Sequence, residues 1–175
     1  MLNCIVKHLS NLLGCRTRRK IVVIETDDRG SIRMPSLKAY RRLQQLGLNI
    51  DKSDNQRFNT LDTLASPNDL EPLFDTPRQV KDSQGYYPVF TAMPLVANPD
   101  FEKIAANDFT QYAYEPFTTT LQRYVLSNAF EPWRQGADER LFHPEFHGRE
   151  HLNVKVWMEA LRKEDPHMRT AFDKG

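Results

Sequence analysis

The chain has 175 residues, a length that suits one domain of ordinary size. Its 24 basic and 23 acidic residues give a formal net charge of +1 at pH 7. No long basic run is present, so the composition argues against nucleic acid as a partner. No stretch approaches the length of apolar sequence that crosses a membrane. Two cysteines, Cys4 and Cys15, are too few for a disulfide framework and indicate a reducing compartment.

Residues 1–20 are expected to form a helix followed by a link. Apolar residues recur there at helical spacing, and Gly14 stands where a helix would end. The run Leu12–Cys15 is similar to a lipoprotein cleavage box, but Lys7 and Ser10 interrupt the apolar stretch before it. We therefore expect no signal peptide, no lipid anchor and a cytoplasmic location.

The next segments alternate between strand and helix patterns. Ile21–Asp28 is a β-branched run of the kind buried in a parallel sheet, and Ser36 opens a helix that ends at Gly47. Residues 48–85 are polar and rich in turn residues, which predicts an insertion over one end of the sheet. Within it, Ser66 and a following proline predict the start of a short helix.

The second half continues the alternation. We expect strands over 86–96 and 139–146, helices from Asn98 and over 118–128, and a final helix that begins near Arg149 and ends before Pro166. Three strands separated by helices predict a single α/β domain over 1–175, with parallel strands and right-handed crossovers.

Three of the five histidines, His143, His147 and His151, follow one another at four-residue steps. This spacing would form a stripe on a helix, but Pro144 and Gly148 oppose a continuous helix there. The segment is expected to run as a strand into a turn.

Acidic and histidine side chains are expected to meet at one edge of the sheet. The first strand ends in Asp27 and Asp28, and the third ends at His147. The carboxyl ends of parallel strands lie on the same side, where α/β proteins place their ligand sites. Asp28 could instead cap a turn, and Asp27 could pair with a nearby arginine. The two histidines favour a metal site.

This pairing of Asp-Asp with His-x3-His resembles the polysaccharide deacetylases, the NodB-homology carbohydrate esterases. The resemblance implies a deformed (β/α) barrel and metal-dependent hydrolysis of N-acetyl groups on a polysaccharide or amino sugar. It implies Asp27 as catalytic base, and Asp28, His147 and His151 as ligands of a divalent metal, commonly zinc.

The chain also departs from the family pattern. Glu25 and Thr26 replace Thr-Phe, Gly148 replaces a hydroxyl residue, and Leu152 replaces a proline. The family's later arginine and C-terminal histidine motifs have no counterpart before the last residue. We therefore expect the N-terminal part of a barrel, incomplete at its C-terminus and weakly active alone. An open sheet edge would favour a homo-oligomer.

Two alternatives use the same residues. His147–His151 also spells H-x-x-E-H, the inverted zinc-protease signature, which needs a regular helix that Gly148 weakens. The other alternative is a non-catalytic metal-binding or interaction remnant of a deacetylase.

Three further residues are weaker candidates. His143 and Glu150 could support the metal ligands from behind. Trp133 could stack on a sugar ring, although an aromatic residue beside a proline also seals loops.

Overall fold

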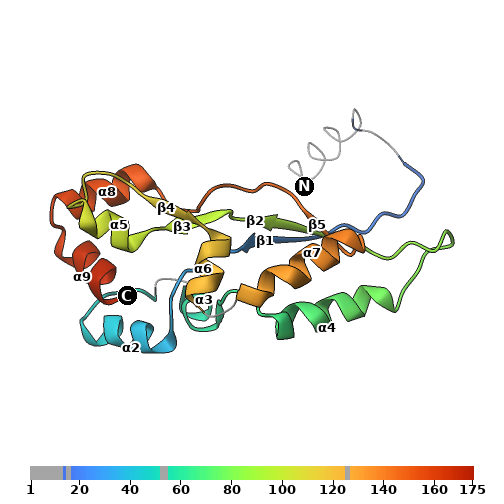
Figure 1. Ribbon diagram of the computed structural model, residues 1–175, viewed down its shortest axis with the longest axis horizontal. Helices are drawn as coiled ribbons and strands as arrows, with labels where there is room; N and C mark the ends of the chain where they lie inside the picture. The colour runs from blue at the N-terminus through green and yellow to red at the C-terminus, as the bar shows by residue number, and fades with distance from the viewer. Residues whose placement is uncertain (1–13, 15–16, 52–54, 125–126) are drawn as a thin grey trace, which may run out of the picture.

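The structure, a computed structural model, describes residues 14, 17–51, 55–124 and 127–175 (Figure 1). Strands β1 (Ile24–Arg29), β2 (Phe90–Pro94) and β5 (Phe142–Pro144) form a parallel sheet in the order β1-β2-β5. Strands β3 (Ala97–Pro99) and β4 (Tyr114–Pro116) form an antiparallel pair. The helices are α2 (Leu37–Gln45), α3 (Asn55–Leu61), α4 (Pro67–Arg78), α5 (Phe101–Ala106), α6 (Phe117–Arg123), α7 (Phe130–Asp138), α8 (Val154–Arg162) and α9 (Pro166–Lys174), with a 3₁₀ turn, η2, at Ser127–Ala129. The predicted mixed α/β fold with parallel strands is confirmed.

One face of the parallel sheet packs on helices. Ile24, Phe90 and Phe142 are register partners, so their side chains leave the sheet on the same side. Figure 1 shows α4 and α7 along that side. The core between these layers consists of Leu70, Phe74, Ala92, Trp133, Leu141 and Phe142.

The opposite face of the sheet is polar. Glu25, Thr91 and His143 are register partners there, and Asp27 lies beside Met93. In Figure 1, none of the described helices covers this face. Parallel sheets are normally covered on both faces. The polar side chains explain how this one can face water.

Helices α4 and α7 fit closely because α7 contains Gly136. A Cβ atom at this position would lie 2.5 Å from Cζ of Phe74 on α4. Helix α4 belongs to residues 48–85, the predicted insertion, yet it supplies Leu70 and Phe74 to the main core.

No helix was predicted over 130–138, where Pro132 and Gly136 oppose one. Pro132 falls in the first turn of α7, where a missing N–H does no harm.

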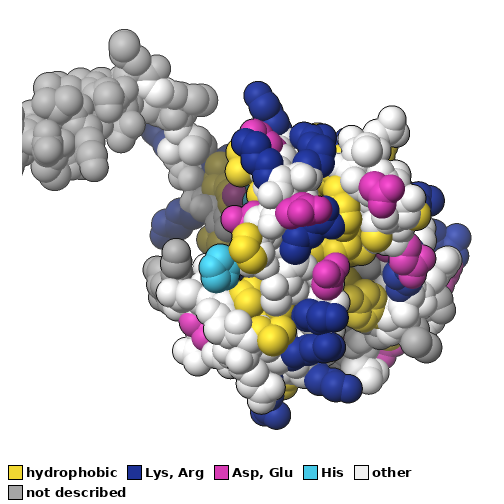
Figure 2. Space-filling model, turned by 90° about the vertical axis from the view of Figure 1, so that its left-hand side faces the viewer, with side chains coloured by type: hydrophobic (Ala, Val, Ile, Leu, Met, Phe, Trp, Pro, Cys, Tyr) yellow, Lys and Arg dark blue, Asp and Glu magenta, His cyan; other side chains and the backbone are white. Residues whose placement is uncertain are grey.

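A second core lies at the other end of the molecule, where α5, α8 and α9 gather beyond β3 and β4 (Figure 1). It consists of Ile104, Phe109, Met158 and Leu161, with Trp157, Met168 and Phe172 packed against them. Figure 2 views this end. Basic and acidic side chains lie there among apolar patches.

Several predicted boundaries are wrong. Ile21, Val22 and Val23 were expected inside the sheet, but they precede β1 and are exposed. Asn98 was expected to begin a helix. It lies in β3 instead, and α5 starts after Asp100, whose side chain caps it.

The last two helices also differ from the prediction. Helix α8 begins after Asn153, which caps it, and not near Arg149. The tail around His167 forms α9, capped by Asp165.

The predicted N-terminal helix and the cysteines lie outside the described residues. Within the described part of the chain, no helix has the length and apolar character needed to cross a membrane.

Candidate metal centre

Asp28 occupies a bulge at the carboxyl end of β1. Asp27 pairs with Met93 and Arg29 with Pro94, so Asp28 is an extra residue without a partner in the β1–β2 ladder. Its φ of 58° lies in the left-handed region, which aspartate tolerates better than most residues. A bulge turns a side chain away from the regular alternation of a strand. The carboxylate of Asp28 is therefore aimed independently of its neighbours.

The chain turns sharply after the bulge. Gly30 has a φ of +89°, and a Cβ atom there would lie 2.6 Å from the carbonyl oxygen of Leu95. Only glycine satisfies both conditions without strain. The amide of Leu95 donates to the carbonyl of Arg29 at 2.8 Å, which joins this turn to the end of β2.

The histidine segment is attached to the same end of β2. Gly148 forms a parallel bridge with Leu95, and the amides of Val96 and Ala97 donate to the carbonyls of Gly148 and Arg149 at 3.2 and 3.0 Å. These bonds lie between His147 and His151 in sequence. They hold both histidines at the carboxyl edge of the sheet, as predicted.

Arg149 braces this segment from the side. Its guanidinium lies 5.3 Å from the ring centroid of Tyr112 and 4.6 Å from that of Tyr114, and it forms two hydrogen bonds with Glu150. These bonds raise the pKa of Arg149. Burial, followed by the charge of Glu150, raises the pKa of Tyr112 to about 12. The two tyrosines were not predicted to lie here, because nothing in the local sequence indicates a contact across this distance.

Asp28, His147 and His151 converge as the sequence predicted. Oδ1 of Asp28 lies 3.0 Å from Nδ1 of His151 and 3.5 Å from Nε2 of His147. The imidazole centroids are 4.7 Å apart. One possible ligand atom from each residue lies within 4.8 Å of the other two. The three side chains are partly exposed, so an ion could reach them from solvent.

The polar atoms of this cluster are not satisfied by one another. Oδ1 of Asp28 and Nε2 of His147 are buried without a hydrogen-bond partner. The short contact between Asp28 and His151 therefore lacks the geometry of a hydrogen bond. Buried polar atoms normally have partners. One carboxylate oxygen and two imidazole nitrogens within 4.8 Å of one another are a set of donors that a divalent cation accepts.

A cavity of about 820 Å³ adjoins the cluster. Its wall includes Asp28, Glu150 and His151, and also Phe101, Trp157 and Asn98. This volume lies in the range of small-molecule sites in proteins. A ligand in the cavity would have access to the cluster of Asp28 and His151.

Asp27 stands apart from these contacts. It is exposed on the polar face of the sheet, and it forms no hydrogen bond or ion pair within the described part of the chain. The alternative pairing of Asp27 with Arg29 or Arg33 is not observed, and Arg33 pairs with Asp62 instead. Arg29 donates to Thr26 at 2.9 Å and lies over the ring of Phe142, where burial lowers the pKa of its guanidinium.

The structure places the weaker candidates outside the cluster. The imidazole of His143 pairs with Glu145 at 3.0 Å and is largely exposed, and Glu150 is engaged by Arg149. Trp133 is buried, packed edge-on against Phe142 at 5.0 Å. Its place in the main core leaves no ring face for a sugar, which corrects that prediction.

The inverted zinc-protease interpretation is also wrong. It requires His147, Glu150 and His151 on one helix, but α8 begins only at Val154.

Comparison with known proteins identifies no relative of this chain: no family model, no curated protein and no solved structure matches it.

Proposed function

We propose that this protein is a metal-dependent deacetylase that hydrolyses N-acetyl groups on a polysaccharide or amino sugar. The observation that carries this proposal is the convergence of Asp28, His147 and His151 around buried atoms that lack hydrogen-bond partners. We also propose that the open sheet is the N-terminal part of a deformed (β/α) barrel. The order of its parallel strands and the cluster at their carboxyl ends support this.

Zinc is the proposed ion. Imidazole nitrogen and carboxylate oxygen are donors that zinc takes, and catalytic zinc sites use three protein ligands with one position open. When bound, the ion would polarise an acyl oxygen and bring the pKa of a bound water to about 7.

The residues around the cluster have distinct proposed roles. Asp27 is the sequence neighbour of Asp28, and its carboxylate forms no hydrogen bond or ion pair among the described residues. It is therefore available to accept a proton from the attacking water. The cavity beside His151 would receive the acetylated substrate, and the exposed ring of Phe101 on its wall offers an apolar surface.

Metal binding without turnover is the second candidate function. The amine that leaves during amide hydrolysis needs a proton. Among the described histidines, His143 pairs with Glu145 and His167 lies in α9, so neither joins the cluster. This observation favours the second candidate.

Metal analysis of dialysed protein tests the centre. Wild type should retain zinc, His147→Ala should lose it, and His143→Ala should keep it because that ring lies outside the cluster. Equally little metal in wild type and His147→Ala would show that the site is wrong.

Acetate release from N-acetylglucosamine oligomers then separates the two functions. Release by the zinc-loaded chain, abolished by chelation, supports a deacetylase. Full zinc occupancy without any release supports the non-catalytic candidate.

A further inference from the structure

A single buried side chain holds the turn that follows Asp28. Asn98, on β3, is 4% exposed. Its Nδ2 donates to the carbonyl of Gly30 at 2.8 Å, and its Oδ1 accepts from the amide of Ile32 at 3.0 Å. Both ends of the Gly30–Ile32 segment are therefore bound to one amide group.

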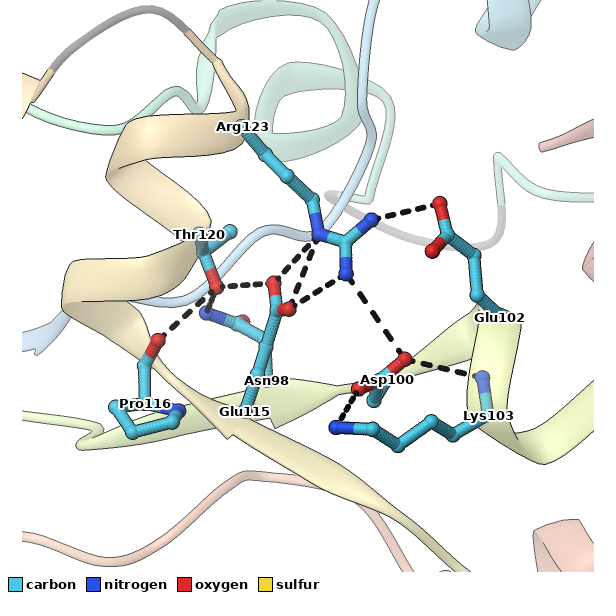
Figure 3. Close-up of polar contacts among 8 residues, drawn as sticks. All are labelled: Asn98, Asp100, Glu102, Lys103, Glu115, Pro116, Thr120 and Arg123. Atoms are coloured by element: carbon cyan, nitrogen blue, oxygen red, sulfur yellow. Dashed lines mark hydrogen bonds and ion pairs between the residues drawn. The ribbon is translucent and has the colours of Figure 1, made fainter.

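Asn98 is in turn held from behind. Its Nδ2 also lies 3.2 Å from Oγ1 of Thr120, which donates to Glu115 at 3.0 Å. Figure 3 shows how this chain of contacts continues into the Arg123 cluster, which we define as Asp100, Glu102, Glu115, Thr120 and Arg123. The cluster joins β4, α5 and α6. The hydrogen bond from Asn98 to Thr120 therefore connects the Asn98 side chain to three elements of the fold.

The Arg123 cluster is held by charge-assisted bonds. Arg123 forms bonds of 2.9 to 3.2 Å with the buried carboxylate of Glu115 and one of 2.8 Å with Glu102. Hydrogen bonds between ionised groups are stronger than neutral ones, and those with a desolvated partner are screened less by water. The bonds that Asn98 makes are thereby held in a defined geometry.

The turn that carries Asp28 depends on such support. Its own closing bond, from the amide of Ser31 to the carbonyl of Asp28, is long at 3.4 Å. Asn98 supplies two shorter bonds to the same turn. A displacement of Gly30–Ile32 would move the Asp28 carboxylate, because only Arg29 separates them.

The histidine half of the cluster is attached to the residues just before Asn98. Leu95 binds Arg29, while Val96 and Ala97 bind Gly148 and Arg149 through their backbones. The four residues Leu95–Asn98 therefore hold both halves of the centre. The backbone bonds of Leu95, Val96 and Ala97 do not depend on side-chain identity. The attachment to Gly30 and Ile32, in contrast, depends on the side-chain amide of Asn98.

We propose that Asn98 is a positioning residue that sets the Asp28 carboxylate relative to His147 and His151. The proposal rests on the proposed metal centre, since its consequence is a defined coordination geometry. Residues that only orient metal ligands commonly change affinity by ~10–100-fold when they are replaced.

The test uses Asn98→Asp with Asn59→Asp as its matched control. The carboxylate introduced by Asn98→Asp would still accept from the amide of Ile32 but could not donate to Gly30, and its charge would repel the Gly30 carbonyl. Asn59 is also a buried asparagine that donates to a backbone carbonyl, that of Ile50 at 2.9 Å, but among the described residues it forms no hydrogen bond with the Asp28 turn. The pair separates a local effect on the turn from a general loss of stability.

The first measurement is titration with Co²⁺, whose visible spectrum reports coordination geometry. Asn98→Asp should weaken binding ~10–100-fold and alter the spectrum, whereas Asn59→Asp should change neither. Asn98→Ser, a smaller side chain that retains a donor, should fall between wild type and Asn98→Asp. A wild-type spectrum and affinity in Asn98→Asp, or equal changes in Asn98→Asp and Asn59→Asp, would overturn the proposal.

Hydrogen exchange of the metal-free protein is the second measurement. Asn98→Asp should accelerate exchange over residues 29–33 and leave α8 unchanged, while Asn59→Asp should leave 29–33 protected. This arm does not need metal. If wild type binds no Co²⁺, the proposed function fails, while exchange still decides whether Asn98 holds the turn.

Discussion

Asp27 and Asp28 are adjacent in sequence, yet the bulge gives their carboxylates different surroundings. Asp27 stays in the regular ladder and faces the polar side of the sheet. Asp28 leaves the ladder and reaches the histidines. The extra residue in β1 thus gives Asp28 the position of a candidate metal ligand, while the Asp27 carboxylate has no bonding partner among the described residues. Replacement of each aspartate by asparagine tests this difference.

Asp28→Asn should release the metal and Asp27→Asn should retain it. Asparagine tolerates the left-handed backbone of Asp28, so the change removes the charge without straining the turn. Affinity for zinc should fall by at least the ~10–100-fold that loss of a merely supporting residue causes. Competition with a chromogenic chelator measures both constants. Equal affinities in the two variants would contradict the assignment of ligand and base.

Gly30→Ala should destabilise the protein more than Gly47→Ala does. Both glycines have positive φ, but a Cβ at Gly30 meets the Leu95 carbonyl while one at Gly47 meets no atom within 4 Å. Gly47→Ala should lower the free energy of unfolding by ~1 kcal/mol, the usual cost of a left-handed backbone. Urea unfolding should show a larger loss of unfolding free energy for Gly30→Ala. Equal losses in the two variants would mean that the backbone moves to remove the clash between the new Cβ and the Leu95 carbonyl oxygen at little cost.

At the scale of elements, the Arg123 cluster holds the β3–β4 pair against α5 and α6. Asp100 is buried at the start of α5, where its side chain accepts from the amide and the ammonium of Lys103. Burial alone would raise the pKa of Asp100, but the bonds from Lys103 and the charge of Arg123 outweigh it and leave that pKa below the ordinary value of 3.8.

This lowered pKa predicts a specific loss of stability in acid. A carboxyl group whose pKa is lower in the folded than in the unfolded state stabilises the fold above the unfolded value, here 3.8, and loses that contribution as the pH falls through the folded value. Asp100→Asn keeps a helix cap but no charge. It should therefore show a shallower decline of unfolding free energy below pH 3.8 than wild type. Asp138→Asn, an exposed change on α7, should follow wild type, and a parallel decline in all three would contradict the prediction.

Local patterns predicted the elements that local chemistry determines. Ser36 and Ser66 cap α2 and α4 as expected, although α4 extends over 12 residues. Parallel strands placed Asp28, His147 and His151 at one edge of the sheet, because the carboxyl ends of such strands share that edge.

Features that depend on distant partners escaped prediction. Asn98 before a proline is typical of a helix start, but its function is set by Gly30 and Ile32, which lie far away in sequence. Gly136 is typical of a helix breaker, yet it is the contact point for Phe74. In both cases tertiary packing outweighed the local preference of the residue.

At the scale of the whole molecule, the sheet has two free edges among the described strands, β1 and β5. The β1 edge is preceded by Ile21, Val22 and Val23, with Val22 86% exposed. Unpaired backbone groups beside exposed aliphatic side chains favour pairing with another strand. We expect a second copy of the chain to be one such partner.

Val22→Lys should reduce self-association, because a lysine at a sheet edge opposes pairing with another strand. Sedimentation velocity over a range of concentrations would measure the change. Val156→Lys, at an exposed position on α8, is the control and should associate like wild type. A wild-type chain that stays monomeric throughout would count against association through this edge.

The shared attachment at Leu95–Asn98 also makes the candidate metal centre a cooperative unit. Neither the Asp28 turn nor the histidine segment could open alone without breaking bonds to the same four residues. A bound ion would therefore protect β3 and β4 against local unfolding, although neither strand contains a ligand. On heating, the ion would be released in a single step as these strands open.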